Sequence, residues 1–143
     1  MAEKNDKLRD ARILVVEDDS DTREIVQFIL EQSGAAVVAV GSVTKALETY
    51  MEIEPDVVIA DIAMPDYNGF ALIAQIREED SKLGRTTPAI ALTAFTSAAD
   101  QERALSAGFQ EYMSKPFDPG ELIATVSKLL HPPGASDIGS SAA

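Results

Sequence analysis

The sequence predicts an α/β fold in which a parallel sheet is covered by helices on both faces. Short apolar runs alternate along the chain with longer amphipathic segments, a pattern typical of β–α–β units. Three of these runs are nearly all apolar, as expected for strands that are buried on both faces. The length of 143 residues and the hydrophobic fraction of 45% suit one domain with its own core.

The apolar runs give five expected strands. In chain order they are Ile13–Val16, Ala36–Val40, Val57–Ala60, Ala89–Leu92 and Glu111–Met113. The first, third and fourth are nearly all apolar, so we expect helices to lie against both of their faces.

The first two expected helices carry end signals or a clear apolar face. Asp21 and Glu24 form a capping pair at the start of the first helix, and Gly34 is placed to end it. In the second helix, apolar residues recur at helical spacing and predict a stripe that faces the core. The stripe consists of Val43, Ala46, Leu47, Tyr50 and Met51.

Three further helices complete the alternation. The third is expected over Phe70–Glu78. Ser97 and Asp100 can cap the fourth, which Gly108 can end. The fifth begins at Asp118–Glu121, which places an N-cap Asp, a Pro in the first helical position and a Glu two residues later. Its core-facing residues are Leu122, Ile123, Val126, Leu129 and Leu130.

Both ends of the chain lack a periodic pattern. Residues 1–10 are polar and predict a flexible N-terminal arm, whereas residues 132–143 are rich in Pro, Gly, Ser and Ala and predict a disordered tail or a linker stub. The domain itself is expected over residues 11–131. His131 lies where the last helix ends, and we expect it to be structural.

Composition excludes several classes of function. A net charge of −12, from 12 basic and 24 acidic residues, repels nucleic acid and anionic lipid, so we expect no direct contact with either. The absence of cysteine excludes disulfides and thiolate zinc sites. No apolar run approaches the roughly 20 residues of a membrane span, and the N-terminus does not look like a secretory signal, so we expect a cytoplasmic domain.

Charged and hydroxyl residues directly follow four of the expected strands. Glu17–Asp19 follow the first strand, Asp61 the third, Thr93 the fourth, and Lys115 lies just beyond the fifth. Because the carboxyl ends of parallel strands form one edge of the sheet, where ligands bind in open α/β folds, these side chains are expected to meet there.

This set of residues favours phosphoryl transfer. Two carboxylates at 4 Å repel by about 4 kcal/mol at an effective dielectric constant near 20, so converging acids indicate a bound cation. Oxygen ligands suit Mg²⁺, and a lysine and a hydroxyl beside them can bind phosphoryl oxygens. Each residue alone has an ordinary explanation, such as a helix N-terminus, a loop or a solvated surface. Their common position favours the chemical interpretation.

In order and spacing, these residues resemble the receiver domains of two-component response regulators. The matching segments are Ile13–Asp19, Asp61–Pro65 with Gly69, Leu92–Ala94 and Lys115–Phe117. The resemblance covers about Arg12 to Leu130. It implies a flavodoxin-like, three-layer α/β/α fold with five helices and the strand order 2-1-3-4-5.

The resemblance also implies a metal site. Asp61 corresponds to the phosphoacceptor. Asp18 and Glu17, together with Asp61 and the backbone carbonyl of Ala63, correspond to the ligands of Mg²⁺ or Mn²⁺.

Further matched residues correspond to a phosphate-binding switch. Thr93 and Lys115 resemble the catalytic hydroxyl and lysine that pair with the phosphoryl group, and Ala94 lies beside Thr93 in the same loop. Tyr112 matches an aromatic switch position in the fifth strand. The bond between Lys115 and Pro116 is expected to be cis, which is uncommon for an X–Pro bond.

The function that the resemblance implies is a signalling switch, not an enzyme acting on other substrates. A histidine kinase or a histidine phosphotransfer protein would donate a phosphoryl group from phosphohistidine to Asp61. The face formed by the fourth helix, fifth strand and fifth helix would then be remodelled, which allows a phosphorylation-dependent homodimer. Ala63 and Phe95 correspond to positions that tune hydrolysis of the acyl phosphate. Since neither can orient water well, we expect slow autodephosphorylation.

Other interpretations are left open. The chain could be a stand-alone response regulator, or a receiver from a hybrid histidine kinase or larger regulator. A flavodoxin-like nucleotide or flavin module would need a phosphate-cradling loop after the first strand, where acids stand instead. A phosphohydrolase would usually need a second acid two residues after its nucleophile, where Ala63 stands.

Overall fold

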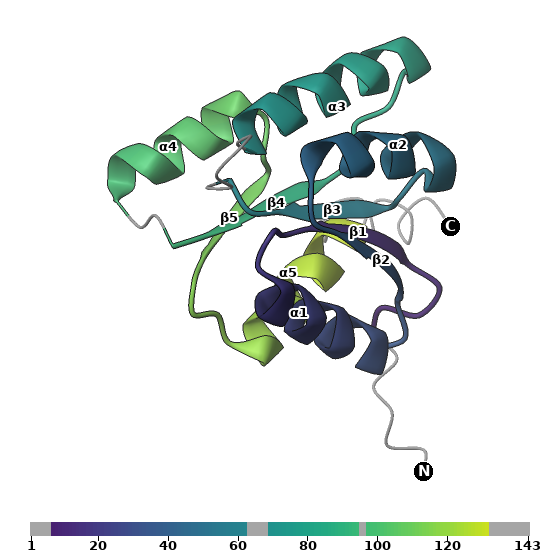
Figure 1. The fold of residues 1–143 in the computed structure, drawn as a ribbon, viewed down its shortest axis with the longest axis vertical. Coiled ribbons are helices and arrows are strands. Elements are labelled where there is room, and N and C mark those ends of the chain that lie inside the picture. The colour runs from purple at the N-terminus through teal and green to yellow at the C-terminus, as the bar shows by residue number, and fades with distance from the viewer. Residues whose placement is uncertain (1–6, 63–68, 95–96, 132–143) are drawn as a thin grey trace, which may run out of the picture.

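The computed structural model describes residues 7–62, 69–94 and 97–131, and in these ranges it contains a five-stranded parallel sheet (Figure 1). The strand order is β2-β1-β3-β4-β5. The strands are β1 (Arg12–Val16), β2 (Ala36–Val40), β3 (Val57–Ala60), β4 (Ala89–Thr93) and β5 (Glu111–Ser114). The predicted fold class and strand order are therefore confirmed, and each strand ends within one residue of its expected position.

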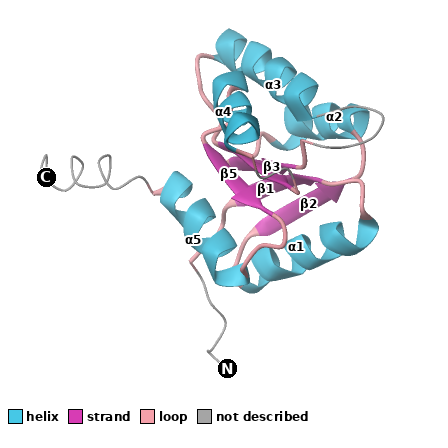
Figure 2. Ribbon diagram, turned by 90° about the vertical axis from the view of Figure 1, so that its left-hand side faces the viewer, coloured by secondary structure: helices cyan, strands magenta, loops and turns pink. Residues whose placement is uncertain are grey.

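Helices cover both faces of the sheet, so the molecule has the expected three layers (Figure 2). They are α1 (Ser20–Gln32), α2 (Val43–Ile53), α3 (Gly69–Leu83), α4 (Ala98–Ala107) and α5 (Pro119–Leu130). The helices α1 and α5 lie on one face, and α2, α3 and α4 lie on the other (Figures 1 and 2). None of the described helices has the length and apolar character needed to cross a bilayer.

Alternating strand residues build one half of the core on each face of the sheet. In β1, Leu14 and Val16 face α2 and α3, whereas Ile13 and Val15 face α1 and α5. All four are at most 1% exposed. Burying such a side chain stabilises the fold by roughly 1.5–3 kcal/mol, which explains why these four positions of β1 are all apolar.

The register of the sheet aligns the carboxyl ends of its central strands. Val16 at the end of β1 pairs with Val40 on one side and with Ala60 on the other. On the far side of β4, Thr93 pairs with Ser114. The residues that follow β1 and β3 are consequently neighbours, as the sequence pattern predicted.

Most of the predicted helix ends are confirmed. The side chain of Ser97 accepts a hydrogen bond from the backbone N–H of Asp100, and Asp118 does the same for Glu121. Gly34 and Gly108 lie just beyond the ends of their helices with φ of 99° and 126°, a conformation that only glycine adopts without strain.

The cap of α1 was assigned to the wrong acid. Asp19, not Asp21, is the N-cap, and its carboxylate accepts hydrogen bonds from the backbone N–H and the hydroxyl of Thr22. Asp21 lies in the first turn, where a negative charge still interacts favourably with the helix dipole. The helix begins earlier because the Asp19 carboxylate already satisfies an N–H of the first turn.

Two further expectations on the helices are corrected. Met51 is 52% exposed, because α2 presents Thr49 and Tyr50 to the core at that level instead. The helix α3 runs to Leu83 rather than ending at Glu78, because Asp80 is buried at its C-terminal end and is held by the Tyr50 hydroxyl of α2 and by the backbone N–H and hydroxyl of Thr87. The core-facing residues of α5 are buried or half-buried as expected.

The ordered chain also begins earlier than residue 11. Leu8 is fully buried against the α1–α5 half of the core, and its backbone N–H donates to the carbonyl of Ser33 over 2.9 Å. Residues 7–10 are therefore part of the packed structure and not of an arm. The rest of the expected arm, and the expected tail over residues 132–143, lie outside the described residues.

Candidate functional site

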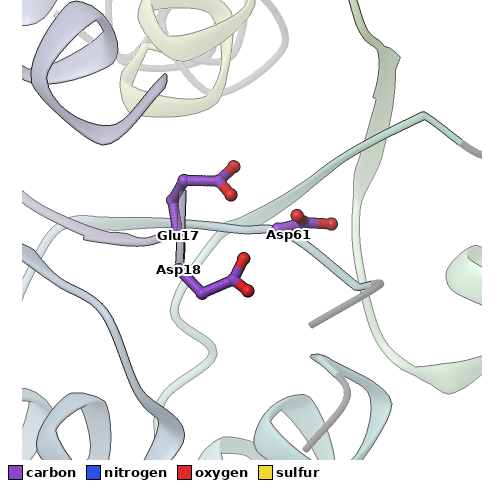
Figure 3. Close-up of side chains that lie close together, drawn as sticks. All are labelled: Glu17, Asp18 and Asp61. Atoms are coloured by element: carbon purple, nitrogen blue, oxygen red, sulfur yellow. The ribbon is translucent and has the colours of Figure 1, made fainter. Parts of the chain in front are cut away.

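Three carboxylates meet at the carboxyl edge of the sheet. Glu17 and Asp18 follow β1 and Asp61 follows β3, and a ligand oxygen from each lies within 4.8 Å of the others. Figure 3 shows the three side chains pointing into one space. Glu17 and Asp61 are only 2% and 6% exposed, whereas Asp18 is exposed. The sequence prediction that these acids lie together is confirmed.

Backbone hydrogen bonds hold the two loops beside each other. The N–H of Glu17 donates to the carbonyl of Val40 over 3.0 Å, and the N–H of Asp61 donates to the carbonyl of Val16 over 3.0 Å. Each acid thus continues the ladder of its strand by one step. The carboxylate of Glu17 also accepts a hydrogen bond of 3.1 Å from the N–H of Asp19.

Lys115 provides a positive charge to two of the acids. Its Nζ lies 2.7 Å from Oε1 of Glu17 and 3.1 Å from Oδ2 of Asp61. Burial raises the pKa of Glu17, and the hydrogen bond from Lys115 offsets this only in part. Burial alone would lower the pKa of Lys115, but its bonds to Glu17 and Asp61 outweigh that effect and raise it. Lys115 therefore stays a cation at neutral pH.

The end of β4 places a hydroxyl residue at the same edge. Thr93 is fully buried, and its carbonyl accepts a hydrogen bond of 2.8 Å from the N–H of Lys115. Ala94 follows and is exposed. The peptide bond between Lys115 and Pro116 is cis, as expected.

Tyr112 lies in β5, beside Ala91 of β4. Its half-buried ring packs against the core on the side of α2, α3 and α4. Its hydroxyl is buried and has no hydrogen-bond partner among the described residues. Burial, and then the charge of Asp100, raise the pKa of this hydroxyl.

Glycine at the start of α3 allows that helix to pack directly on the loop of Asp61. A Cβ added to Gly69 would lie 2.8 Å from Cα of Ile62 and 2.9 Å from the carbonyl oxygen of Asp61. Any side chain there would push the loop away from its position. The sequence matched this glycine to a motif but did not predict the close contact.

An apolar hollow of about 540 Å³ adjoins the acids on the side of α1. Its lining residues are Thr22, Ile25, Ile29, Ala94, Lys115, Pro116, Phe117 and Pro119. On the same helix, Ile25 and Phe28 are 54% and 62% exposed. The sequence did not predict this surface, because exposed apolar residues do not stand out from core residues in a helical pattern.

The donor set fits a hard divalent cation. Carboxylate oxygens are ligands that Mg²⁺ prefers, and the exposed carboxylate of Asp18 leaves an open side for water or a phosphate. Two of the residues that the sequence singled out, Ala63 and Phe95, lie outside the described residues.

Comparison with known proteins agrees with this geometry. The family model described as the response regulator receiver domain matches residues 13–127. The chain belongs to this family. Receiver domains act in two-component systems together with histidine kinases and phosphotransfer proteins, and the family typically binds Mg²⁺.

Individual relatives support the same assignment. An uncharacterized 14.6 kDa protein of Leptolyngbya boryana is 44% identical over 125 residues, which are 86% of this receiver and 94% of that protein. The phosphate regulon transcriptional regulatory protein PhoB of Escherichia coli is 35% identical over 119 residues, which are 83% of this chain but only 51% of PhoB.

Solved structures share the whole fold. The receiver domain of the Francisella response regulator 1452 superposes with a TM-score of 0.76 at 28% identity, covering 85% of this chain and 97% of that one. The chemotaxis response regulator CheY4 of Vibrio cholerae superposes with a TM-score of 0.77 at 28% identity, covering 85% and 99%.

Proposed function

We propose that this receiver domain is a phosphorylation switch in the cytoplasm, which accepts a phosphoryl group on Asp61 from a phosphohistidine of a kinase or phosphotransfer protein. The observation that carries the proposal is the meeting of Asp61 with Glu17, Asp18 and Lys115 in one place. A carboxylate nucleophile, a metal site and a cation are the parts that phosphoryl transfer requires.

In the transfer, an oxygen of the Asp61 carboxylate attacks the phosphorus. The phosphorus–nitrogen bond breaks, its electron pair goes to the imidazole, and an acyl phosphate forms on Asp61. Mg²⁺ held by Glu17, Asp18, Asp61 and the Ala63 carbonyl would neutralise charge on the phosphoryl oxygens. Lys115, already 3.1 Å from Asp61, is placed to pair with one of these oxygens.

The signal would leave the site through Thr93 and Tyr112. Phosphoryl oxygens attract the Thr93 hydroxyl, which draws its loop towards Asp61 and changes the space beside the Tyr112 ring. The face of α4, β5 and α5 then changes shape and supports binding of a partner or a second copy of the receiver.

The apolar hollow beside Lys115 supports docking of the protein that carries the phosphohistidine. Burying Ile25 and Phe28 under a partner would bring its imidazole to the edge of the acid cluster. An Ile25→Asp variant should therefore keep its reaction with acetyl phosphate and lose transfer from a phosphorylated kinase. Equal loss of both reactions would contradict this docking role.

Incubation with acetyl phosphate and Mg²⁺ tests the central proposal. The wild-type chain should gain one acid-stable, alkali-labile phosphate, measured by intact mass, and Asp61→Asn should gain none. A phosphohydrolase would instead turn the phosphodonor over continuously, and a flavin or nucleotide module would show no phosphorylation. Since Ala63 and Phe95 cannot orient water well, the acyl phosphate should decay slowly; a lifetime of only seconds would contradict that part.

The chain would work as a switch and not as an enzyme on other substrates, since its only reactions would be its own phosphorylation and dephosphorylation. The chain spans about half the length of PhoB, so the transcriptional regulation that PhoB is named for is not part of the proposal.

A further inference from the structure

The peptide group between Glu17 and Asp18 joins two acids of the cluster, and a side chain from α1 holds it. Nη1 of Arg23 donates a hydrogen bond of 2.9 Å to the carbonyl oxygen of Glu17. This oxygen belongs to the peptide that links Glu17 and Asp18, so its orientation constrains the backbone that carries both carboxylates. Arg23 is half-buried and lies one turn after the N-cap of α1.

The carbonyl of Glu17 needs such a partner because the β1–β2 ladder stops there. The N–H of Glu17 makes the last bond of the ladder, to the carbonyl of Val40. After Gly41 the chain turns away into α2, with Ser42 as N-cap. The guanidinium of Arg23 replaces the partner that a longer β2 would have provided.

Gly41 provides the space that the guanidinium occupies. A Cβ at this position would lie 2.7 Å from Nη1 of Arg23 and 3.8 Å from the carbonyl oxygen of Glu17. Gly41 is not among the glycines with positive φ, so the backbone does not require glycine there. The contact with Arg23 is therefore what a side chain at position 41 would disturb.

We propose that Arg23 is a positioning residue for the Mg²⁺ site, and that Gly41 is small so that Arg23 can reach the Glu17–Asp18 peptide. This inference rests on the proposed function, because it assigns how that same site is held. Without a metal the three carboxylates repel one another, and a loop fixed only by its own backbone would spread. Arg23, anchored in a helix, keeps the ligands aimed at one point before the metal arrives.

The test is a cycle of Arg23→Ala, Gly41→Ala and the double variant, each titrated with Mg²⁺ by calorimetry. Each single variant should weaken Mg²⁺ binding by about tenfold, the lower end of the effect of losing an outer-shell partner. In the absence of Arg23, a Cβ at position 41 meets only ordinary contacts, so the double variant should bind Mg²⁺ no more weakly than Arg23→Ala. Arg23→Lys should recover part of the affinity.

A second measurement separates a role of Arg23 in positioning the Mg²⁺ ligands from general damage to the fold. The rate of phosphorylation by acetyl phosphate should reach the wild-type value at saturating Mg²⁺ in all variants, while the Mg²⁺ concentration for half the maximal rate rises. Lys82→Ala removes an exposed cation from α3 and should leave both values unchanged.

The outcomes distinguish this inference from the function on which it rests. A wild-type chain that binds no Mg²⁺ would refute the proposed function. A wild-type chain that binds Mg²⁺, with Arg23→Ala equal to it or tighter, would refute the role of Arg23 alone. Additive losses in the double variant would refute the link between Gly41 and Arg23.

Discussion

Lys115 pairs with two buried carboxylates at once, so its charge should influence what the acid cluster binds. In the structure its ammonium lies between Glu17 and Asp61. A divalent cation at the cluster would compete with Lys115 for the same oxygens, whereas a phosphoryl group would attract both cations. Lys115 should thus oppose metal binding and favour phosphorylation.

Replacing Lys115 by Met is expected to separate these two effects. Mg²⁺ should bind more tightly, because the competing charge is gone. The rate of phosphorylation by acetyl phosphate at saturating Mg²⁺ should fall by about a hundredfold, as when one charge-stabilising group is removed from an active site. Lys128→Met, which removes an exposed lysine paired with Glu111, is the control and should change neither value. Weaker Mg²⁺ binding in Lys115→Met would contradict this account.

Two tyrosines with buried hydroxyls predict opposite effects of the same substitution. The hydroxyl of Tyr50 contacts Asp80 and Thr87, so Tyr50→Phe should destabilise the fold by about 1.5–3 kcal/mol. The hydroxyl of Tyr112 has no partner among the described residues, so Tyr112→Phe should be neutral or stabilise by about 1 kcal/mol. Urea unfolding measures both. A loss of stability in Tyr112→Phe like that in Tyr50→Phe would contradict this reading of the structure.

Among the elements, α3 connects the edge of the sheet where Asp61 lies to the opposite edge, where β4 and β5 begin. Its first residue packs against the Asp61 loop, and its last turns carry Arg77 and Asp80. Oδ2 of Asp80 lies 2.8 Å from Nη1 of Arg77 and accepts a hydrogen bond of 2.7 Å from the N–H of Thr87. Arg77 also donates to the carbonyl of Gly108, over 2.7 Å from Nη2. This network ties the end of α3 to the starts of β4 and β5.

Asp80→Asn is expected to destabilise the fold by about 3–5 kcal/mol near neutral pH, because it removes a buried charge that satisfies several donors. These hydrogen bonds, which outweigh the cost of burial, hold the pKa of Asp80 below its usual value. A carboxyl whose pKa is lower in the folded state than in the unfolded state stabilises the fold fully at pH values above the unfolded-state pKa of about 4. This contribution is lost as the pH falls from there towards the folded-state pKa. The difference in unfolding free energy between wild type and variant should therefore be constant above about pH 5 and shrink below about pH 4. A difference in unfolding free energy that stays constant down to pH 3 would contradict this role of the Asp80 charge.

Local sequence signals predicted those elements that depend on neighbouring residues. Continuous apolar runs are enough to predict buried strands. Ser97 and Asp118 can be predicted as helix caps because each bonds to a residue only three positions later. The end of α3 could not be predicted in this way. In the sequence, Asp80 looks like any solvated acid on a helix surface. Its burial is explained by its contacts with Tyr50, which lies 30 residues away, and with Thr87 in the loop before β4.

The candidate site, too, contains some residues that the sequence predicted and some contacts that it did not. Strand ends predicted that Glu17, Asp18, Asp61 and Lys115 would meet, because parallel topology alone brings them to one edge. The contacts of Arg23, Gly41 and Gly69 were not predicted, because they join separate loops and depend on distances that no local pattern encodes.

At the scale of the whole molecule, the acid cluster connects metal binding to folding. The folded chain holds three carboxylates within 4.8 Å, whereas unfolding separates Asp61 from Glu17 and Asp18. Mg²⁺ should therefore bind the folded state selectively. At a concentration of 100 times its dissociation constant it should stabilise the fold by about 2.7 kcal/mol. For a chain of this size, that raises the melting temperature by roughly 5–10 °C.

Ionic strength is the competing explanation for such a shift, because a net charge of −12 makes the fold sensitive to screening by any salt. Thermal unfolding in MgCl₂ should therefore be compared with NaCl at equal ionic strength, and only the excess in MgCl₂ counts as binding. Asp18→Asn removes one exposed ligand at little cost to folding, so it should keep the NaCl response and lose most of the Mg²⁺ excess. If wild type responds equally to both salts, or Asp18→Asn keeps the full Mg²⁺ excess, the three acids do not couple metal binding to the stability of the fold.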